Sequence, residues 1–260
     1  MNTQKNKDGT VGKALEILDE VASFGRPVRF NDLLAKSPHP KATLYRLVQT
    51  LTSQGMLDYD PDRQTYAPGV RLVRLAHAAW QQSSLAPIAK PILDRLSKEL
   101  GQTIHLAQLD NGQVLYVDKR DAQRPIEMFS QAGKVGPGYC TGVGKAMLAY
   151  LDEESKQKAL AKQSFYAYTE HTLADIDALT AELAEIKQTG ISFDREEHEP
   201  NIICVAVPIL ADSGRVLGGL SITSSTNRTS IEQLKEFAPK MKETASEIAT
   251  ALANWQFPNH

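Results

Sequence analysis

The sequence predicts the α+β fold class, with a small helical domain followed by a larger domain built on an antiparallel sheet. Three observations predict it. Three helical segments and a short hairpin occupy the first 69 residues. Beyond them, alternating segments meet in pairs around Asp110-Asn111-Gly112 and Asp212-Ser213-Gly214, and the first of these turns is a strong hairpin signal. Helical segments lie before, between and after the two strand pairs.

The first 69 residues carry the pattern of three helices and a hairpin. Helical spacing over residues 11–24 ends at Gly25, and a short second helix is expected around residues 30–34. The third helix, residues 40–53, has Pro40 at its first position and a buried face of Leu44, Leu47, Val48 and Leu51. Gly55 ends it, and short strands are expected at residues 56–59 and 64–66. This order predicts a winged helix-turn-helix over residues 1–69.

A connecting helix is expected over residues 70–83. Apolar side chains share one of its sides: Leu72, Val73, Ala76, Ala79 and Trp80. Such a stripe has to be covered, either by a partner subunit or by the same chain folding back. The sequence leaves both possibilities open.

Residues 84–260 mix helices and strands and predict one further domain. Helices are expected at residues 85–100, 145–150, 174–188 and 231–252, with Gly101 and Gly190 ending the first and third. Strands are expected at residues 103–109, 113–118, 203–210 and 216–223, and another near residues 126–131.

The composition is that of a protein with a packed core. Of 260 residues, 42% are hydrophobic and 23% are charged, which excludes a disordered or collagen-like chain. Cys140 and Cys204 are too few for a disulfide scaffold and indicate a reducing compartment. No apolar stretch approaches the roughly 18 residues of a spanning helix, and residues 1–12 lack the apolar core of a signal peptide. We therefore expect a cytoplasmic protein with no membrane partner.

Charge and residue types place a candidate DNA contact in the third helix. Residues 1–80 hold 11 Lys and Arg against 8 Asp and Glu, whereas residues 81–260 hold 18 against 23. A recognition helix needs an apolar back and short polar or cationic side chains near its N-terminus. Five residues of this helix and one of the hairpin meet that need: Lys41, Ala42, Thr43, Tyr45, Arg46 and Arg63. The alternative is a solvated face on a protein-interaction module.

Three features of the larger domain are candidates for ligand binding. Thr141-Gly142-Val143-Gly144 leads into a helix expected to begin near Lys145, a junction that either binds an anion or only packs the helix on a sheet. The hydroxyls of Ser221 and Thr223 share one face of a strand. Asp194 begins an acidic run that by itself predicts a solvated loop. His105, on a strand face, fits a core histidine better than a pocket residue.

Three stretches together resemble the IclR-type family of bacterial transcription regulators. The first is Pro40 to Leu51 (PKATLYRLVQTL), followed by Gly55-Met56-Leu57. The second is CTGVGKAMLA from Cys140. The third begins at Asp194 (DREE), continues through CVAVP from Cys204 and ends in GGLSIT from Gly218. The resemblance implies a winged helix-turn-helix and a GAF-like effector domain, joined by the linker helix.

The resemblance also implies which residues contact the effector and which partners the protein has. The implied pocket residues are Gly142, Val143, Asp194, Cys204, Ser221 and Thr223, with Tyr139 and Cys140 as possible additions. Asn201 stands where the family usually has Gly, and Asn tolerates left-handed backbone. We expect a transcription regulator, a repressor or an activator, that forms a homodimer or homotetramer and binds double-stranded DNA at a palindromic operator. The polar pocket favours a small organic acid, either a sugar acid or a keto acid.

An enzyme and a metal site are the remaining alternatives. Cys204 with His105, His171 or His198 would make a Cys–His nucleophile, but no local signature supports it. Asp194, His198 and Cys204 lack the spacing of a zinc site. We expect no catalytic activity, no cofactor and no bound metal.

Overall fold

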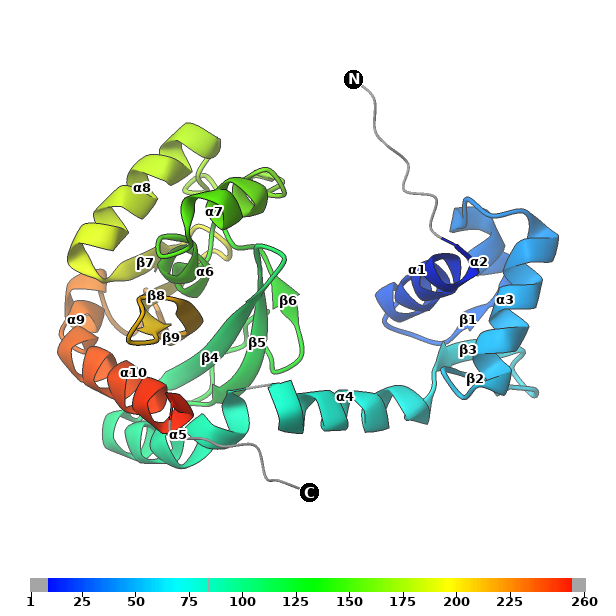
Figure 1. Cartoon of the computed structure of the whole chain (residues 1–260), viewed down its shortest axis with the longest axis horizontal. Coiled ribbons are helices and arrows are strands. Elements are labelled where there is room, and N and C mark those ends of the chain that lie inside the picture. The colour runs from blue at the N-terminus through cyan, green and yellow to red at the C-terminus, as the bar shows by residue number, and fades with distance from the viewer. Residues whose placement is uncertain (1–8, 84, 254–260) are drawn as a thin grey trace. The chain divides into compact units, whose positions relative to one another are not determined.

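The chain divides after Ser83 into two compact units, and each is described by itself (Figure 1). The computed structural model describes residues 9–83 and 85–253. Both units combine helices with antiparallel strands, as expected of the α+β class.

The first unit is a winged helix-turn-helix, as predicted. Its helices are α1 (Thr10–Ser23), α2 (Phe30–Lys36) and α3 (Lys41–Ser53). Its strands are β1 (Val28–Arg29), β2 (Leu57–Asp60) and β3 (Thr65–Pro68), in the order β1-β3-β2. The two residues of β1 are too few to give a sequence pattern, so the third strand was not predicted.

Helix α3 is held on the first unit by its apolar face. Leu44, Leu47, Val48 and Leu51 are all buried in the core shared with α1. Pro40 was expected at the first helical position, but its ψ of 144° makes it the N-cap instead. An extended residue at the N-cap is ordinary because only the following residue needs helical angles.

The connecting helix α4 (Val70–Ser83) leaves large apolar side chains exposed. Val70 is 83% exposed and Val73 69% exposed, and Leu75 is also exposed. Of the expected stripe, Val73, Ala76 and Ala79 are exposed, whereas Trp80 is half-buried and Leu72 packs partly buried against the core of the first unit.

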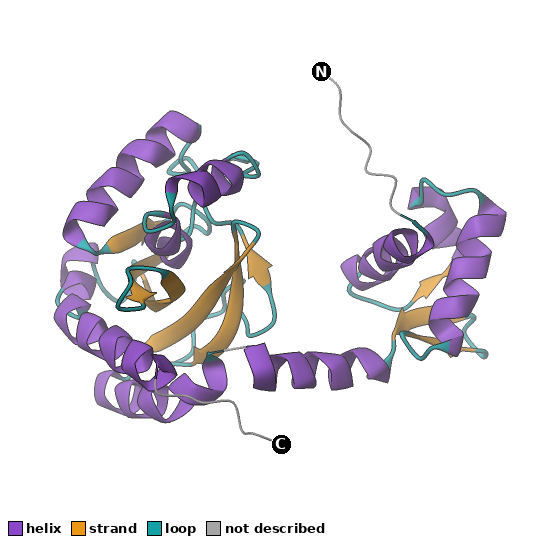
Figure 2. Ribbon diagram, in the orientation of Figure 1, coloured by secondary structure: helices purple, strands orange, loops and turns teal. Residues whose placement is uncertain are grey.

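The second unit is built on a curled six-stranded antiparallel sheet (Figure 2). The strand order is β6-β5-β4-β9-β8-β7. The strands are β4 (Thr103–Asp110), β5 (Gln113–Arg120), β6 (Val135–Gly136), β7 (Ser192–Arg195), β8 (Ile202–Leu210) and β9 (Val216–Ser225). The hairpin around Asn111 and Gly112 has positive φ at both residues, as the sequence predicted.

Helices cover both faces of this sheet. The short helix α6 (Gly142–Leu148) packs on β8 and β9 and also contacts α8 (Ile176–Thr189), while α5 (Ala86–Leu100) and α10 (Ala238–Ala253) pack together on the other face (Figure 1). Helix α7 (Glu153–Leu160) was not predicted.

The last helix was predicted as one piece, and this is wrong. It is divided into α9 (Ile231–Lys235) and α10, with a break at Glu236 and Phe237. Ser230 and Gln233 form a capping box that starts α9. Pro239, which has no backbone N–H to donate, sits in the first turn of α10, where none is needed.

The strand expected near residues 126–131 is also absent from the described chain, and β6 lies further on. We call residues 126–131 the cover segment. The backbone N–H of Phe129 donates to both carboxylate oxygens of Glu199, at 3.1 and 3.0 Å, rather than to a neighbouring strand. The Ser130 hydroxyl likewise lies 2.8 Å from His105 Nε2. These bonds of Phe129 and Ser130 go to side chains and do not extend the sheet.

Candidate functional site

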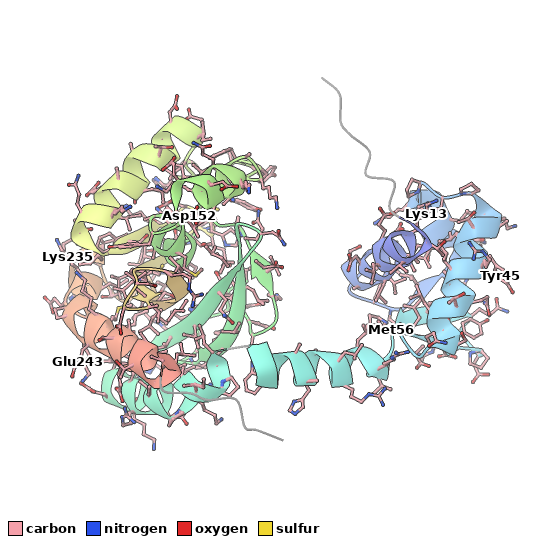
Figure 3. The ribbon with its side chains drawn as sticks, in the orientation of Figure 1. Lys13, Tyr45, Met56, Asp152, Lys235 and Glu243 are labelled. Atoms are coloured by element: carbon pink, nitrogen blue, oxygen red, sulfur yellow. The ribbon has the colours of Figure 1, made fainter. Side chains whose placement is uncertain are left out.

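The outward face of α3 presents the residues expected to contact DNA. Lys41, Ala42, Tyr45 and Arg46 are exposed and Thr43 is half-buried. Figure 3 shows Tyr45 projecting from α3 on the side away from α1. Its ring packs edge-on against Phe30 of α2, with 5.8 Å between the ring centroids. The face therefore combines a fixed aromatic ring with extended cationic side chains.

The cations near this face are available to an anion. Among the described residues neither Lys41 nor Arg46 takes part in an ion pair, and no side chain caps the N-terminus of α3. Arg63, in the connection between β2 and β3, is 79% exposed and lies 3.8 Å from Asp60, a weak surface pair. Free cations and uncapped N–H groups suit phosphate oxygens.

A buried cavity in the second unit brings together all six residues expected to contact an effector. Its walls include Gly142, Val143, Asp194, Cys204, Ser221 and Thr223. It also takes in residues that the sequence did not single out: Tyr116, Met128, Ser130 and Ile202. Thr141 of the glycine-rich junction and His198 and Glu199 of the acidic run line it as well. Tyr139 and Cys140 are not among the lining residues. The cavity measures about 30 Å³, room for about one water molecule.

His105 is a buried, hydrogen-bonded histidine, as preferred from the sequence, and it also lines this cavity, which the sequence preference had set aside. The ring is buried, and Nε2 lies 2.8 Å from the Ser130 hydroxyl. Nδ1 lies 3.5 Å from the Ser221 hydroxyl and 3.3 Å from that of Thr223. Burial lowers the pKa of His105 to about 3, so the ring is neutral near pH 7. His105 thus joins strand β9 to the cover segment.

Asp194 is buried on β7 and is not the start of a solvated loop. It pairs with Cys204 of β8 in the sheet register, and its Oδ1 accepts the backbone N–H of Glu197 at 2.8 Å. Burial, reinforced by the nearby Glu197 carboxylate, raises the pKa of Asp194 to about 8. The carboxyl group is therefore largely protonated at neutral pH and can donate a hydrogen bond.

Behind the cavity lies a buried ionic network that the sequence did not reveal. Lys145 of α6 is fully buried, and its Nζ lies 2.5 Å from Glu197 Oε1 and 3.2 Å from Glu182 Oε1 of α8. Arg195 contacts the same Glu182 oxygen at 3.1 Å. Burial raises the pKa of Glu197, while Lys145 opposes that shift. The partners are 37 and 52 positions apart, a separation that no local motif records.

Glycine at 142 is required by close approach rather than by a positive φ. Helix α6 begins there, three residues earlier than expected. A Cβ at Gly142 would lie 2.5 Å from Cys204 Sγ and 3.1 Å from the Asp194 nitrogen. The helix start therefore sits directly against β7 and β8, which places Gly142 and Val143 in the cavity wall.

Asn201 adopts the left-handed backbone expected at the position where the family usually has Gly. Its φ is 63°, and its N–H donates to a Glu196 carboxylate oxygen at 2.6 Å. The turn that leads from the acidic run into β8 is therefore kept with Asn in place of Gly.

The buried thiols are poorly suited to nucleophilic catalysis. Burial and the nearby Asp194 raise the pKa of Cys204, and burial raises that of Cys140. Both sulfurs therefore stay protonated, whereas a reactive cysteine needs a thiolate. Within residues 9–83 and 85–253, no group of His, Cys, Asp and Glu is arranged to hold a metal ion.

Comparison with known proteins identifies the family. The model described as "Bacterial transcriptional regulator IclR C-terminal" matches residues 77–250, and the "IclR helix-turn-helix domain" matches residues 10–61. The chain belongs to the IclR family. It is 30% identical to the transcriptional regulator XynR of Escherichia coli K12, over 94% of this chain and 96% of XynR. It is 29% identical to the regulator KdgR of the same strain, over 96% of this chain and 95% of KdgR.

A solved structure agrees with this assignment. The IclR of Thermotoga maritima is 29% identical, with a TM-score of 0.70, and the match covers 94% of this chain and 98% of that one. As an IclR-family member, the protein is a DNA-binding transcriptional regulator with a C-terminal effector-binding domain, and its relatives are regulators rather than enzymes. Among the helices of the described residues, none is long and apolar enough to span a membrane.

Proposed function

We propose that this IclR-family regulator changes its operator affinity when a small sugar acid or keto acid binds the cavity of the second unit. The observation that carries the proposal is the shared cavity of Gly142, Val143, Asp194, Cys204, Ser221 and Thr223. These residues come from α6, β7, β8 and β9, which lie far apart in the sequence.

The chemistry of the cavity suits a hydroxylated acid. The hydroxyls of Ser221 and Thr223 and the neutral ring of His105 can each donate or accept a hydrogen bond. A protonated Asp194 adds a donor and carries no charge to repel a carboxylate. A buried negative charge at Asp194 would oppose an anionic ligand, so its raised pKa supports an acid as the effector.

DNA binding is assigned to the face of α3, with its N-terminal turn in the major groove and Arg63 on the flanking backbone. Arg46 can pair with phosphate or with the edge of a guanine. A homodimer or homotetramer would place two such faces on a palindromic operator, with half-sites about 34 Å or a multiple apart. The exposed apolar side chains of α4 support pairing with a second copy.

Substitution of Ser221 tests the effector site. In Ser221→Ala we expect the Kd for gluconate or pyruvate to rise at least about fivefold, because one net hydrogen bond contributes about 1 kcal/mol. At a given acid concentration the thermal stabilisation should therefore be smaller than in the wild type. Operator binding without ligand should be unchanged. Thermal-shift titration and fluorescence anisotropy measure the two effects.

Ser224→Ala is the matched control for this experiment. Ser224 lies on the same strand, β9, and is buried, but it lines a different cavity. The control should keep the full response to the acid. Equal responses in the wild type and Ser221→Ala would contradict the proposed site.

A further inference from the structure

The inner cavity has a larger neighbour, and the two share a wall. A second cavity of about 520 Å³ is lined by Phe129, Val135, Pro137, Tyr168, His198 and Glu199, among others. His198 and Glu199 also line the inner cavity. Small-molecule sites usually measure roughly 300–1,000 Å³. The inner cavity, at about 30 Å³, is far below that range, whereas its neighbour, which we call the outer pocket, lies within it.

The wall between the two cavities is a single layer of side chains. Along the cover segment, Met128 and Ser130 are buried and line the inner cavity, while Phe129 between them lines the outer pocket. The Phe129 ring contacts His198, with 5.3 Å between the ring centroids, and Lys134 Nζ, at 4.7 Å. Ser130 bonds His105 at 2.8 Å, and the Phe129 backbone donates to the Glu199 carboxylate. A ligand that replaces the Ser130–His105 bond would join the two spaces.

The outer pocket has aromatic walls with a few polar groups. His198 lies between Phe129 and Tyr168, with ring centroids at 5.3 and 4.8 Å. Phe129 is 38% exposed and Tyr168 is 43% exposed, so part of each ring faces solvent. Gln113 and Ser164 add an amide and a hydroxyl to the lining. Aromatic faces carry a negative quadrupole, to which the polarised C–H groups of a sugar ring are attracted.

Hydrogen-bond donors and aromatic rings, rather than charge, distinguish the two cavities. The Glu199 carboxylate lines both of them, and Lys134 Nζ lies 4.7 Å from the Phe129 ring beside the outer pocket, so charge alone assigns the acid group to neither. Ser221, Thr223 and the protonated Asp194 can donate hydrogen bonds to a carboxylate in the inner cavity. The aromatic rings of the outer pocket suit an uncharged hydroxylated ring, whose hydroxyls can donate to Glu199.

We propose that the outer pocket is a second subsite of the effector site, which binds a neutral sugar ring attached to a sugar acid. This inference rests on the proposed function and narrows its ligand class to glycosylated sugar acids. With the cover segment moved aside, the inner end of the joined space takes the carboxylate and its neighbouring hydroxyls. The ring stacks on Tyr168 and Phe129 once the cover segment has moved aside.

Gluconate and lactobionate form a matched pair of probes, because lactobionate is gluconate carrying one neutral galactosyl ring. Calorimetric titration of the full chain should show lactobionate binding at least about 10-fold more tightly than gluconate. Tyr168→Ala and Phe129→Ala should each weaken lactobionate about 2- to 10-fold, the contribution of an aromatic contact. Gluconate should bind the wild type and Tyr168→Ala equally.

Tyr166→Ala is the control, because Tyr166 is exposed and packs on Tyr168 without lining the outer pocket. It should leave both affinities unchanged. If gluconate binds through Ser221 but lactobionate binds no tighter, or if Tyr168→Ala and Phe129→Ala weaken both acids equally, the second subsite is wrong and the effector site stands. If neither acid binds, the sugar-acid assignment and the subsite are both wrong.

Discussion

Asp194 and His105 line the same cavity, and burial keeps both side chains uncharged near neutral pH. The pKa of Asp194 is raised to about 8 and that of His105 is lowered to about 3. Together with Ser221 and Thr223 they provide uncharged donors and acceptors in a cavity that Glu199 also lines. These four groups can bond to a carboxylate without first losing an ion pair.

The neutral Asp194 predicts a loss of stability at high pH. An unfolded Asp has a pKa of about 3.9, so between about pH 4 and pH 8 the folded state holds one proton more than the unfolded state. The free energy of unfolding therefore falls as pH rises through this range, by up to about 1.4 kcal/mol per pH unit. His105 has a folded pKa of about 3, below its unfolded value of about 6.5, so between these pH values it makes the free energy of unfolding rise with pH. The fall should thus be clearest between pH 6.5 and 8.

Urea unfolding of Asp194→Asn at pH 6.5 and 8 measures this effect. The variant keeps an uncharged side chain of the same shape, so its stability should change less between the two pH values than that of the wild type. Asp212→Asn, at an exposed hairpin position, should retain the wild-type dependence. Identical pH dependence in the wild type and Asp194→Asn would show that Asp194 is ionised in the folded state at pH 6.5.

Helix α3 is the element assigned to the DNA, and Arg46 is one of its two exposed cations, with Lys41. Arg46→Ala should weaken operator binding by about 1–3 kcal/mol, or about 5- to 150-fold, because it removes a charged contact to a base or phosphate. The melting temperature should not change, since Arg46 packs in no core. Fluorescence anisotropy at a fixed salt concentration measures the affinity.

Arg215→Ala is the charge-matched control for Arg46→Ala. Arg215 is exposed in the second unit, in the connection between β8 and β9. Its removal changes the net charge by the same amount and should leave operator affinity within about twofold. An equal loss in both variants would mean that α3 does not make the contact assigned to Arg46.

Elements with a strong local signal were predicted well. Helices α1 and α3 have long amphipathic faces, and the β4–β5 hairpin has an Asn-Gly turn. The cover segment misled the prediction because its alternation of Met128, Phe129 and Ser130 arises from two cavities on either side of it, not from a sheet. The break between α9 and α10 was missed because the apolar face continues across it.

The candidate site was predicted in part. Its six effector residues came from the family resemblance, and the hydroxyls of Ser221 and Thr223 also from strand periodicity. His105 and the buried Lys145 were missed as site components because their partners come from distant segments. Lys145 contacts Glu182 and Glu197 only because α6, α8 and β7 pack together. No local sequence pattern predicts that packing.

At the scale of the whole molecule, the two units have separate hydrophobic cores and bind different ligands. The IclR family assignment gives DNA binding to the first unit and effector binding to the second. Regulation requires that the effector bind the DNA-competent and DNA-incompetent states with different affinities. The exposed apolar side of α4, which lies between the two domains in the chain, is a candidate route for this coupling through a second copy.

Reciprocal coupling between acid and operator is the most direct test. On an operator fragment selected by the protein from random DNA, a saturating sugar acid should change the operator Kd at least about fivefold, and saturating operator should change the acid Kd by the same factor. Ser221→Ala should need at least about fivefold more acid to produce the same change in operator Kd. An operator Kd that stays constant while the acid is shown to occupy the cavity would contradict control of DNA binding by this site.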